Sequence, residues 1–368
     1  MRFTFLAACA LALAACSPTA ISDIAMGAAP ESVEALVQAE RNRAQAPGIS
    51  VAVVKDGELL FAQGYGLANV EHNVPATEHT IFQSGSIGKQ FTAAAVLLLV
   101  EDGKLELDAP LSSYMPETPA SWNDITIRRL LTHTAGLPDY AEDTVDLRRD
   151  YSDDELAQII FAMPLISEPG TAWSYSNTAY ALLGVLIHKV SGKHYLDVLK
   201  ERVFTPTGMT TARGISEADI VLNRSAGYHS VDGILKNQDW VSPYFSSTAD
   251  GALYLTALDL VAWDTAIREG AVLKPESWQE MFTPATFKDG SARGYGLGWF
   301  LDAPGGEPRQ SHSGSWQGFT SAIARYPNRD LTVIVLANHA HAKPTTLAAA
   351  IARAVEPDLP EESLVWAK

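Results

Sequence analysis

The stretch QSGSIGKQFTAAAVLLLV, residues 83–100, places a serine and a lysine three residues apart at the start of an almost wholly apolar run. Gly103 follows where helices commonly end, so the stretch predicts a helix too apolar to lie outside the core. Residues i and i+3 share a helix face with Cβ atoms ~5–6 Å apart, so Ser86 and Lys89 would be neighbours. A serine is activated when a base removes its proton, and a buried lysine can lose its charge and serve as that base. The alternative is structural, with a solvated Lys89 beside a serine that caps the helix.

The composition is that of a globular protein with a strongly negative charge. The chain has 368 residues, of which 47% are hydrophobic and 19% charged, and its net charge is −16. This length suits one large domain or two ordinary ones. Because like charges repel, we expect no nucleic-acid partner and no attraction to an anionic membrane surface.

Residues 1–16, MRFTFLAACALALAAC, predict a targeting segment that is not part of the fold. The segment has a basic start followed by an apolar run of signal-peptide length. That run is too short to span a bilayer as a mature helix. The last four letters resemble the bacterial lipobox, in which cleavage precedes a cysteine that is then lipidated. We therefore expect a lipid anchor on Cys16, a tether over residues 17–29 and a periplasmic protein held on a bacterial membrane, with Ser17 compatible with the outer membrane. The alternative is an ordinary signal peptide cut nearby.

Cysteine usage narrows the chemistry further. Cys9 leaves with the signal peptide, and no cysteine follows Cys16. Disulfides, thiol catalysis and cysteine-ligated metals are thereby excluded from the fold.

Strand patterns lie at both ends of the remaining chain, and helical patterns lie between them. Asp56-Gly57 between two β-branched runs is a strong hairpin signal. We expect helices over residues 30–45, 86–100, 125–132, 152–162, 177–190, 194–203, 256–267, 275–282 and 348–355, and strands over 49–54, 59–68, 294–301, 309–313, 319–326 and 331–338. The interpretation is an α+β fold: an antiparallel sheet flanked by the N- and C-terminal helices, with a mainly helical region inserted. Residues 30–368 would form one domain, its α/β part about 30–82 and 250–368 and its helical part about 83–249, with loops from 204–250 over the site.

Two further short patterns bear on Ser86. The first is Tyr175-Ser176-Asn177, before the helix over 177–190, where a phenol could pass a proton and an amide could hold a carbonyl. The alternative is an aromatic residue packed on a helix start with Asn177 as the N-cap. A second Y-x-N, at Tyr326-Pro327-Asn328, falls in the turn of the last hairpin and is interpreted as structural.

The second pattern is His312-Ser313-Gly314, followed by Ser315, at the end of a predicted strand. A strand edge near a nucleophile can present backbone N–H groups as an oxyanion hole. His312 would add a donor or a cation there. The alternative is an ordinary histidine in a turn.

Together the three patterns resemble the serine-reactive penicillin-recognising family, which includes class C β-lactamases, D-Ala-D-Ala carboxypeptidases, D-aminopeptidases and related esterases. The order S-x-x-K, Y-x-N, [KH]-[ST]-G is the family signature. Similar to the family as well are LLTHTAGLPDY (130–140), PGTAWSYSNTAYALLG (169–184), GALYLTALDLVAW (251–263) and GYGLGW (294–299). The resemblance covers about residues 30–355 and implies a β-lactamase/transpeptidase-like fold.

The resemblance implies a role for each catalytic residue. Ser86 would be the nucleophile and Lys89 the group that activates it. Tyr175 would act as general base toward Ser86 and then as acid toward the leaving group. The backbone N–H groups of Ser86 and Ser315 would form the oxyanion hole.

The resemblance also implies substrate contacts for Asn177, His312, Gly314 and Ser315. His312 stands where many β-lactamases of the family have the lysine that helps to bind a substrate carboxylate. Its unperturbed pKa of ~6.5 would make it a conditional cation. This departure lowers the expectation of efficient β-lactamase activity.

The function predicted is that of an exported serine hydrolase acting through an acyl-enzyme on esters or amides, including peptides and β-lactams. No cofactor and no metal is implied. Esterase or peptidase activity is ranked slightly above that of a dedicated β-lactamase; a D-Ala-D-Ala carboxypeptidase is a further alternative. Two alternatives lie outside this class: a non-catalytic relative that binds cell-wall peptide or a protein, and a metalloenzyme using His339 and His341, which lacks H-E-x-x-H or a nearby carboxylate cluster.

Overall fold

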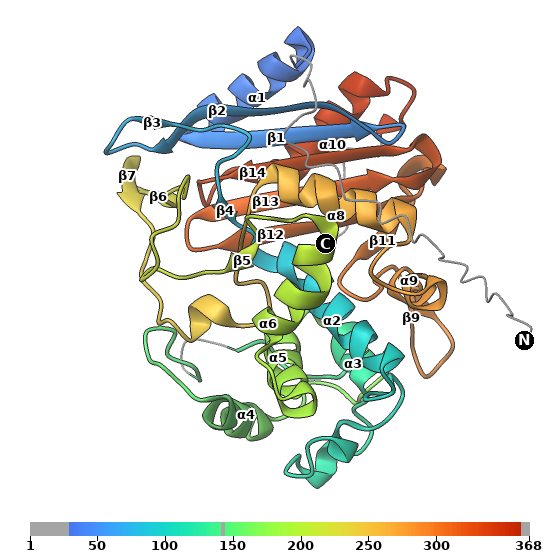
Figure 1. The fold of residues 1–368 in the computed structure, drawn as a ribbon. Helices are drawn as coiled ribbons and strands as arrows, with labels where there is room; N and C mark the ends of the chain where they lie inside the picture. Colours follow the sequence, from blue (N-terminus) through green and yellow to red (C-terminus); the bar gives the residue numbers. More distant parts are fainter. Residues whose placement is uncertain (1–28, 141–143, 362–368) are drawn as a thin grey trace, which may run out of the picture.

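The computed structural model describes residues 29–140 and 144–361 (Figure 1). The predicted signal peptide over 1–16, the predicted lipidation of Cys16 and all but the last residue of the predicted tether lie outside the described residues. Within the described part, no helix has both the length and the apolar character needed to cross a membrane.

A seven-stranded antiparallel sheet joins the two ends of the chain, as the sequence predicts. Its strand order is β11-β12-β13-β14-β1-β2-β3. The strands are β1 (Gly48–Lys55), β2 (Glu58–Asn69), β3 (Val74–Pro75), β11 (Phe300–Asp302), β12 (Arg309–Trp316), β13 (Phe319–Tyr326) and β14 (Leu331–Ala337). β1 pairs with β14, with Ile49 opposite Ala337. The β1–β2 turn is the expected two-residue hairpin, because Asp56 and Gly57 both have positive φ, 51° and 82°.

Both faces of the sheet are covered. The side chains of β1 point alternately to one face and the other, and they show which elements cover each. Val51 and Val53 pack into one core with α1 (Glu31–Ala44) and α10 (Pro344–Val355), the helices at the two chain ends (Figure 1). Ala52 and Val54 face the opposite core, which is shared with the helical region. Because successive strand residues point to opposite faces, a strand buried on both sides reads as an unbroken apolar run.

The helical region is built around α2 (Lys89–Glu101), whose residues 89–99 are all buried. A helix that is apolar on every side must be surrounded by other elements. The other helices are α3 (Ile127–Leu131), α4 (Asp153–Phe161), α5 (Asn177–Ser191), α6 (Tyr195–Leu199), α7 (Thr205–Thr207), α8 (Ala257–Glu269) and α9 (Pro275–Met281). The remaining strands form small sheets: β4 (Phe82–Gln83), β8 (Leu253–Leu255) and β5 (Arg213–Gly214); β6 (Tyr228–Val231) and β7 (Ile234–Asn237); β9 (Ala285–Thr286) and β10 (Ala292–Arg293).

Two of the predicted elements differ from the structure in kind as well as in extent. The strand expected over 294–301 is reduced to β11, because the chain folds back through Gly298, at φ 78°, so that the Leu301 N–H donates to the Gly294 carbonyl at 2.9 Å. The helix expected over 194–203 continues instead through a π-helical turn, Lys200–Phe204, and ends at Gly208.

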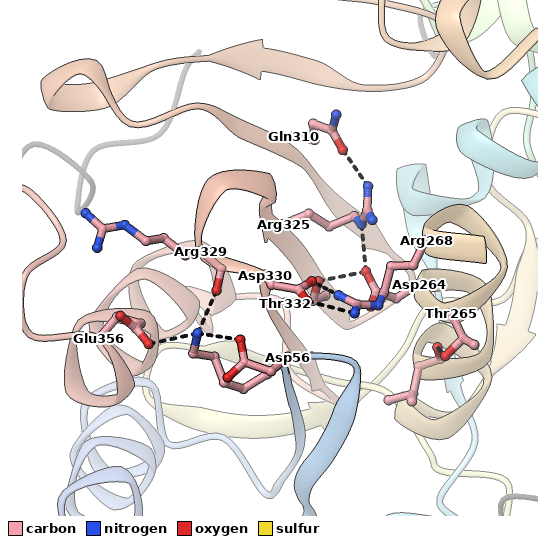
Figure 2. Close-up of polar contacts among 12 residues, drawn as sticks. Asp56, Asp264, Thr265, Arg268, Gln310, Arg325, Arg329, Asp330, Thr332 and Glu356 are labelled. Carbon is pink, nitrogen blue, oxygen red and sulfur yellow. Dashed lines mark hydrogen bonds and ion pairs between the residues drawn. The ribbon is translucent and has the colours of Figure 1, made fainter. Parts of the chain in front are cut away.

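A buried ion pair ties α8 to the sheet (Figure 2). Arg325 of β13 donates from Nε to Asp264 Oδ1 at 2.6 Å, and Thr332 of β14 donates to the same oxygen at 2.7 Å. Asp264 is fully buried. Because an unpaired buried charge is strongly unfavourable, this contact fixes the position of α8 against β13 and β14.

Candidate active site

Ser86 lies at the one opening in an otherwise buried segment. Every residue from Thr80 to Leu99 is buried except Ser86, which is half-buried. It lies in a 3₁₀ turn, Gly85–Gly88, directly before α2. Residues three apart eclipse one another in a 3₁₀ turn, so the turn aligns Ser86 with Lys89.

Backbone segments far apart in the sequence press against the Ser86 peptide, and glycine permits it. A Cβ on Gly314 would lie 2.0 Å from the Ser84 carbonyl oxygen and 3.0 Å from the Ser86 nitrogen. A Cβ on Gly251 would lie 2.4 Å from the Gly85 carbonyl oxygen. Any larger residue at either position would push β12 or the loop before β8 away from the nucleophile.

The same close packing brings the two backbone N–H groups of the expected oxyanion hole to one place. A Cβ on Gly85, the residue before Ser86, would lie 2.4 Å from the Ser315 nitrogen. Ser315 itself lines the cavity in front of Ser86. Backbone nitrogens from two segments thus lie close to Ser86, which is the placement that an oxyanion hole uses.

Lys89 contacts three oxygen atoms at the base of the site. Its Nζ lies 3.1 Å from Ser86 Oγ, 2.6 Å from Asn177 Oδ1 and 2.5 Å from the Asp250 carbonyl oxygen. An ammonium group would donate to all three. A neutral amine fits the same positions, because it can donate to Asn177 and Asp250 while its lone pair accepts the Ser86 hydroxyl hydrogen.

Burial shifts the charge on Lys89 toward the neutral form. The side chain is fully buried, and burial lowers the pKa of Lys89 to about 8, against the opposing effects of Asp250 and Asp139. A pKa near the operating pH suits a general base, because a useful fraction is then deprotonated. Lys89 therefore meets the geometric and the electrostatic requirement for activating Ser86.

Tyr175 lies beside Ser86 and Lys89, and its side chain is the neutral phenol. Its ring centroid is 5.0 Å from Lys89 Nζ, and its hydroxyl has no partner within hydrogen-bonding geometry. Burial raises the pKa of Tyr175 well above its ordinary value, although the nearby Ser86 hydroxyl opposes this. In the free protein a phenol of this kind is a proton donor, so the geometry favours Lys89 over Tyr175 for the first proton transfer.

Asn177 is held from both sides of its amide. Oδ1 accepts from Lys89, and Nδ2 donates to Asp139 Oδ2 at 3.0 Å. The Asp139 carboxylate also accepts the backbone N–H of Asn177 at 2.8 Å, at the start of α5. The N-cap of α5 is Ser176, which accepts from the Ala179 N–H, and not Asn177.

His312 is buried behind the strand edge and belongs to a line of hydrogen bonds. Its Nδ1 lies 2.6 Å from the Ser313 carbonyl oxygen, and its Nε2 lies 3.1 Å from the Tyr295 hydroxyl. Burial, followed by the charge of Lys89, lowers the pKa of His312 to about 3. The ring is therefore neutral at neutral pH, which differs from the conditional cation expected from its unperturbed pKa.

A cavity of about 240 Å³ opens in front of Ser86. Of the sequence-predicted residues, Ser86, Asn177 and Ser315 line it, whereas Lys89, Tyr175, His312 and Gly314 are not among its lining residues. Asp139 and Asp250 are in its wall, and no lysine or arginine is among the described residues that line it.

Sequence reasoning missed several residues of the site. They are His133, Asp139, Tyr140, Asp250 and Tyr295, which line the cavity or contact the catalytic groups. All except Asp250 fall inside the family-like stretches 130–140 and 294–299, and Asp250 immediately precedes the stretch 251–263. The signal was therefore present in those stretches, but no short pattern singled out individual side chains.

The histidines of the H-x-H pattern lie away from these contacts. His339 Nε2 is 3.1 Å from Ser230 Oγ, and both residues belong to the segments around β6 and the end of β14. Over residues 29–140 and 144–361, no group of three histidine, cysteine, aspartate or glutamate side chains is arranged to hold a metal ion.

Comparison with known proteins agrees with this geometry. The Beta-lactamase family model matches residues 33–356. Penicillin-binding protein 4* of Bacillus subtilis is 29% identical over 306 residues, which cover 78% of this chain and 67% of that protein. The D-aminopeptidase of Gluconobacter oxydans is 30% identical over 339 residues, which cover 89% of this chain and 63% of that protein.

A solved structure extends the similarity to the fold. The octameric penicillin-binding protein homologue from Pyrococcus abyssi superposes with a TM-score of 0.78 at 29% identity, covering 90% of this chain and 78% of that one. The predicted fold class is thereby confirmed, although the chain spans only about two thirds of the length of the two curated relatives. With Ser86 and the strand edge at one cavity and Lys89 in contact with Ser86, the chain belongs to the β-lactamase family of serine hydrolases.

Proposed function

We propose that this protein hydrolyses esters or amides through an acyl-enzyme on Ser86. The observation that carries the proposal is the contact between Lys89 Nζ and Ser86 Oγ at 3.1 Å, made by a lysine whose pKa burial lowers to about 8. A base in hydrogen-bond contact with a hydroxyl is the arrangement that activates a serine nucleophile.

In the first step, the neutral Lys89 amine takes the Ser86 hydroxyl proton while Oγ attacks the substrate carbonyl carbon. The negative charge that develops on the carbonyl oxygen is stabilised by the backbone N–H groups of Ser86 and Ser315. Asn177 and the Asp250 carbonyl oxygen hold the lysine in place through both protonation states.

When the tetrahedral intermediate collapses, the bond to the leaving group breaks and its oxygen or nitrogen takes a proton from the Tyr175 hydroxyl. The Lys89 ammonium, which carries the proton from Ser86, returns one to Tyr175. Water then attacks the carbonyl carbon of the acyl-enzyme and gives a proton to Tyr175, which passes its own proton to Lys89. When the bond to Ser86 Oγ breaks, the acid is released and Lys89 returns the proton to Oγ. Each proton removed is returned within one turnover.

The cavity supports a short substrate group without a carboxylate. Its volume of about 240 Å³ is below the ~300–1,000 Å³ of drug-sized ligand sites. Asp139 and Asp250 are in its wall, and the neutral His312 supplies no cation. Like charges in a cavity of low dielectric repel, so we rank neutral or ammonium-bearing esters and amides above penicillins and peptides with a terminal carboxylate.

Intact-mass spectrometry after exposure to a fluorophosphonate tests the reaction, with Ser86→Ala as the control. The expected result is one covalent adduct on the wild-type protein and none on the variant. An unlabelled wild-type protein, or equal labelling of both, would contradict the proposal. Turnover of D-alanine p-nitroanilide against its N-succinyl derivative then tests the ranking, since the two differ in an ammonium and a carboxylate.

We also propose that the protein is exported and anchored to a bacterial membrane through a lipid on Cys16. The support is the sequence of residues 1–16, whose last four letters resemble a lipobox. Metabolic labelling with a radioactive fatty acid should mark the wild-type protein and leave Cys16→Ala unlabelled. Equal labelling of the two proteins would contradict this proposal.

A further inference from the structure

A line of four hydrogen bonds runs behind the cavity and joins two catalytic segments. It begins at the backbone N–H of Ser176, between Tyr175 and Asn177, which donates to His133 Nδ1 at 3.1 Å. His133 Nε2 lies 3.1 Å from the Tyr295 hydroxyl, which lies 3.1 Å from His312 Nε2. The line ends at the Ser313 carbonyl oxygen, 2.6 Å from His312 Nδ1.

The backbone groups at the two ends fix the direction of every bond. Because the Ser176 N–H can only donate, His133 Nδ1 must accept, and the ring hydrogen of the neutral imidazole is on Nε2. That hydrogen is donated to the Tyr295 oxygen, so the Tyr295 hydroxyl hydrogen is free to be donated to His312 Nε2. The hydrogen of His312 is then on Nδ1, where it meets the Ser313 carbonyl oxygen, which can only accept.

Protonation of either imidazole would break this line. A second hydrogen on His133 would face the Ser176 N–H, and a second hydrogen on His312 would face a Tyr295 oxygen that already accepts from His133. Ser176, His133, Tyr295 and His312 are all buried, and an unsatisfied polar group in such surroundings is unfavourable. The line therefore holds both histidines neutral, each with a single tautomer.

The surroundings of the two rings agree with this. The titratable or charged described groups that contact or act on the His312 ring are Lys89, His133, Tyr175 and Tyr295. The His133 ring contacts Tyr175, Tyr180 and Tyr295. None of them carries a negative charge while the phenols are neutral. Burial lowers the pKa of His133 well below its ordinary value as well, with Lys89 and His312 adding to the effect.

The line also supports the Tyr175 ring. The His133 ring lies against it in a tilted contact, with centroids 4.2 Å apart. Tyr295 also contacts the ring, edge-on, with centroids 6.4 Å apart. A shift of Tyr295 would therefore move the loop that carries Tyr175 relative to the strand that carries Ser315.

We propose that Tyr295, together with His133, is a positioning residue for the reaction, which holds the Tyr175 loop and the Ser313–Ser315 strand edge in register around Ser86. The inference rests on the proposed function for its kinetic consequence, but the hydrogen-bond line can be tested without it. Tyr295 does not line the cavity, so it would act on the chemical step and leave substrate binding almost unchanged.

Histidine ¹⁵N NMR of the unmodified protein tests the line directly, with the signals assigned by His133→Asn and His312→Asn. The expected result is one hydrogen on Nε2 of His133 and one on Nδ1 of His312, with both signals unchanged between pH 5 and 8. A His312 ring with hydrogens on both nitrogens at neutral pH, or with the opposite tautomer, would overturn the proposal.

The kinetic test compares Tyr295→Phe with Tyr228→Phe on p-nitrophenyl acetate. Tyr228 is a matched control, because it is also buried and its hydroxyl accepts one hydrogen bond, from the Val70 N–H at 2.8 Å, in another part of the fold. Misplaced catalytic groups lower rates steeply, so we expect kcat of Tyr295→Phe to fall ~10- to ~100-fold with KM nearly constant, and no change for Tyr228→Phe. Equal kcat values for the two variants would reject the positioning role.

The two tests separate this inference from the proposed function. If Ser86 reacts with the fluorophosphonate but His312 carries hydrogens on both nitrogens, the hydrogen-bond line is rejected and the proposed function is not. If Ser86 does not react but both histidines have the expected tautomers, the proposed function is rejected and the hydrogen-bond line is not. If Tyr295→Phe fails to fold, the tautomers of the unmodified protein still decide.

Discussion

Lys89 Nζ lies 3.1 Å from Ser86 Oγ, and the two side chains differ in exposure in the way their chemistry requires. Lys89 is 0% exposed, whereas Ser86 is the one side chain between Thr80 and Leu99 that is not buried. Burial disfavours the ammonium, and partial exposure leaves the serine oxygen accessible to a carbonyl carbon. The start of one helix thus carries a buried amine, the proposed base, and an accessible hydroxyl, the proposed nucleophile.

The pH dependence of hydrolysis should follow Lys89. Because burial lowers the pKa of Lys89 from its usual 10.5 to about 8, and only the neutral amine accepts a proton, kcat/KM should rise with pH and level off above the pKa. His312, with its pKa lowered to about 3, should add no step near neutral pH. Initial rates with p-nitrophenyl acetate, with Ser86→Ala as the blank for spontaneous hydrolysis, provide the measurement. A profile still rising steeply at pH 10 would mean that Lys89 keeps its ordinary pKa.

Removal of the base should be far more damaging than removal of a surface lysine. Lys89→Met keeps the length of the side chain but has no proton acceptor at Nζ, and general-base catalysis contributes typically ~10²- to ~10⁴-fold. We expect kcat to fall by that factor. Lys104→Met, at an exposed lysine just beyond α2, should remain within about twofold of the unmodified protein. Comparable rates for the two variants would exclude Lys89 as the base.

Asp139 should tune that base as well as hold Asn177. Its negative charge raises the pKa of Lys89, so Asp139→Asn should move the rising part of the pH profile to lower pH. The rate at the plateau should fall, by roughly tenfold, because an asparagine has one oxygen and one amide nitrogen and so cannot accept both the Nδ2 hydrogen and the backbone N–H hydrogen of Asn177. Asp56→Asn, in the β1–β2 turn, removes an equal charge and should leave the profile in place. A shift of the Asp139→Asn profile toward higher pH would contradict the assignment.

The ion pair between α8 and the sheet should dominate stability at that position. Asp264→Ala leaves Arg325 buried without its partner, and breaking such a pair typically destabilises by about 3–5 kcal/mol. Asp56→Asn removes the charge that pairs with Lys55 at a carboxylate that is 73% exposed, and asparagine tolerates the positive φ of the turn, so about 1 kcal/mol or less is expected (Figure 2). Urea unfolding of both variants measures the difference. A similar loss in the two would show that the buried pair contributes no more than a surface one.

Local sequence signals placed most of the elements correctly. The Ser152–Glu155 capping box is present at the start of α4, and Gly192, at φ 72°, ends α5 as its position predicts. These signals succeed because caps and left-handed turns depend on the chemistry of a few adjacent residues. The GYGLGW stretch failed as a strand because its glycines permit a fold-back that only the contacts around Tyr295 select.

The sequence by itself determined that Ser86 and Lys89, the proposed nucleophile and base, lie side by side, because a single helical turn joins them and its geometry is local. It also determined that the strands of the two chain ends share a sheet, since their unbroken apolar runs must be covered on both faces. The tertiary structure alone decided the charge states: burial lowers the pKa of Lys89 and keeps Tyr175 and His312 uncharged at neutral pH. Those follow from burial and from partners such as Asp139, Asp250 and Tyr295, which come from distant segments, and electrostatic energy depends on distance in space and on the surrounding dielectric.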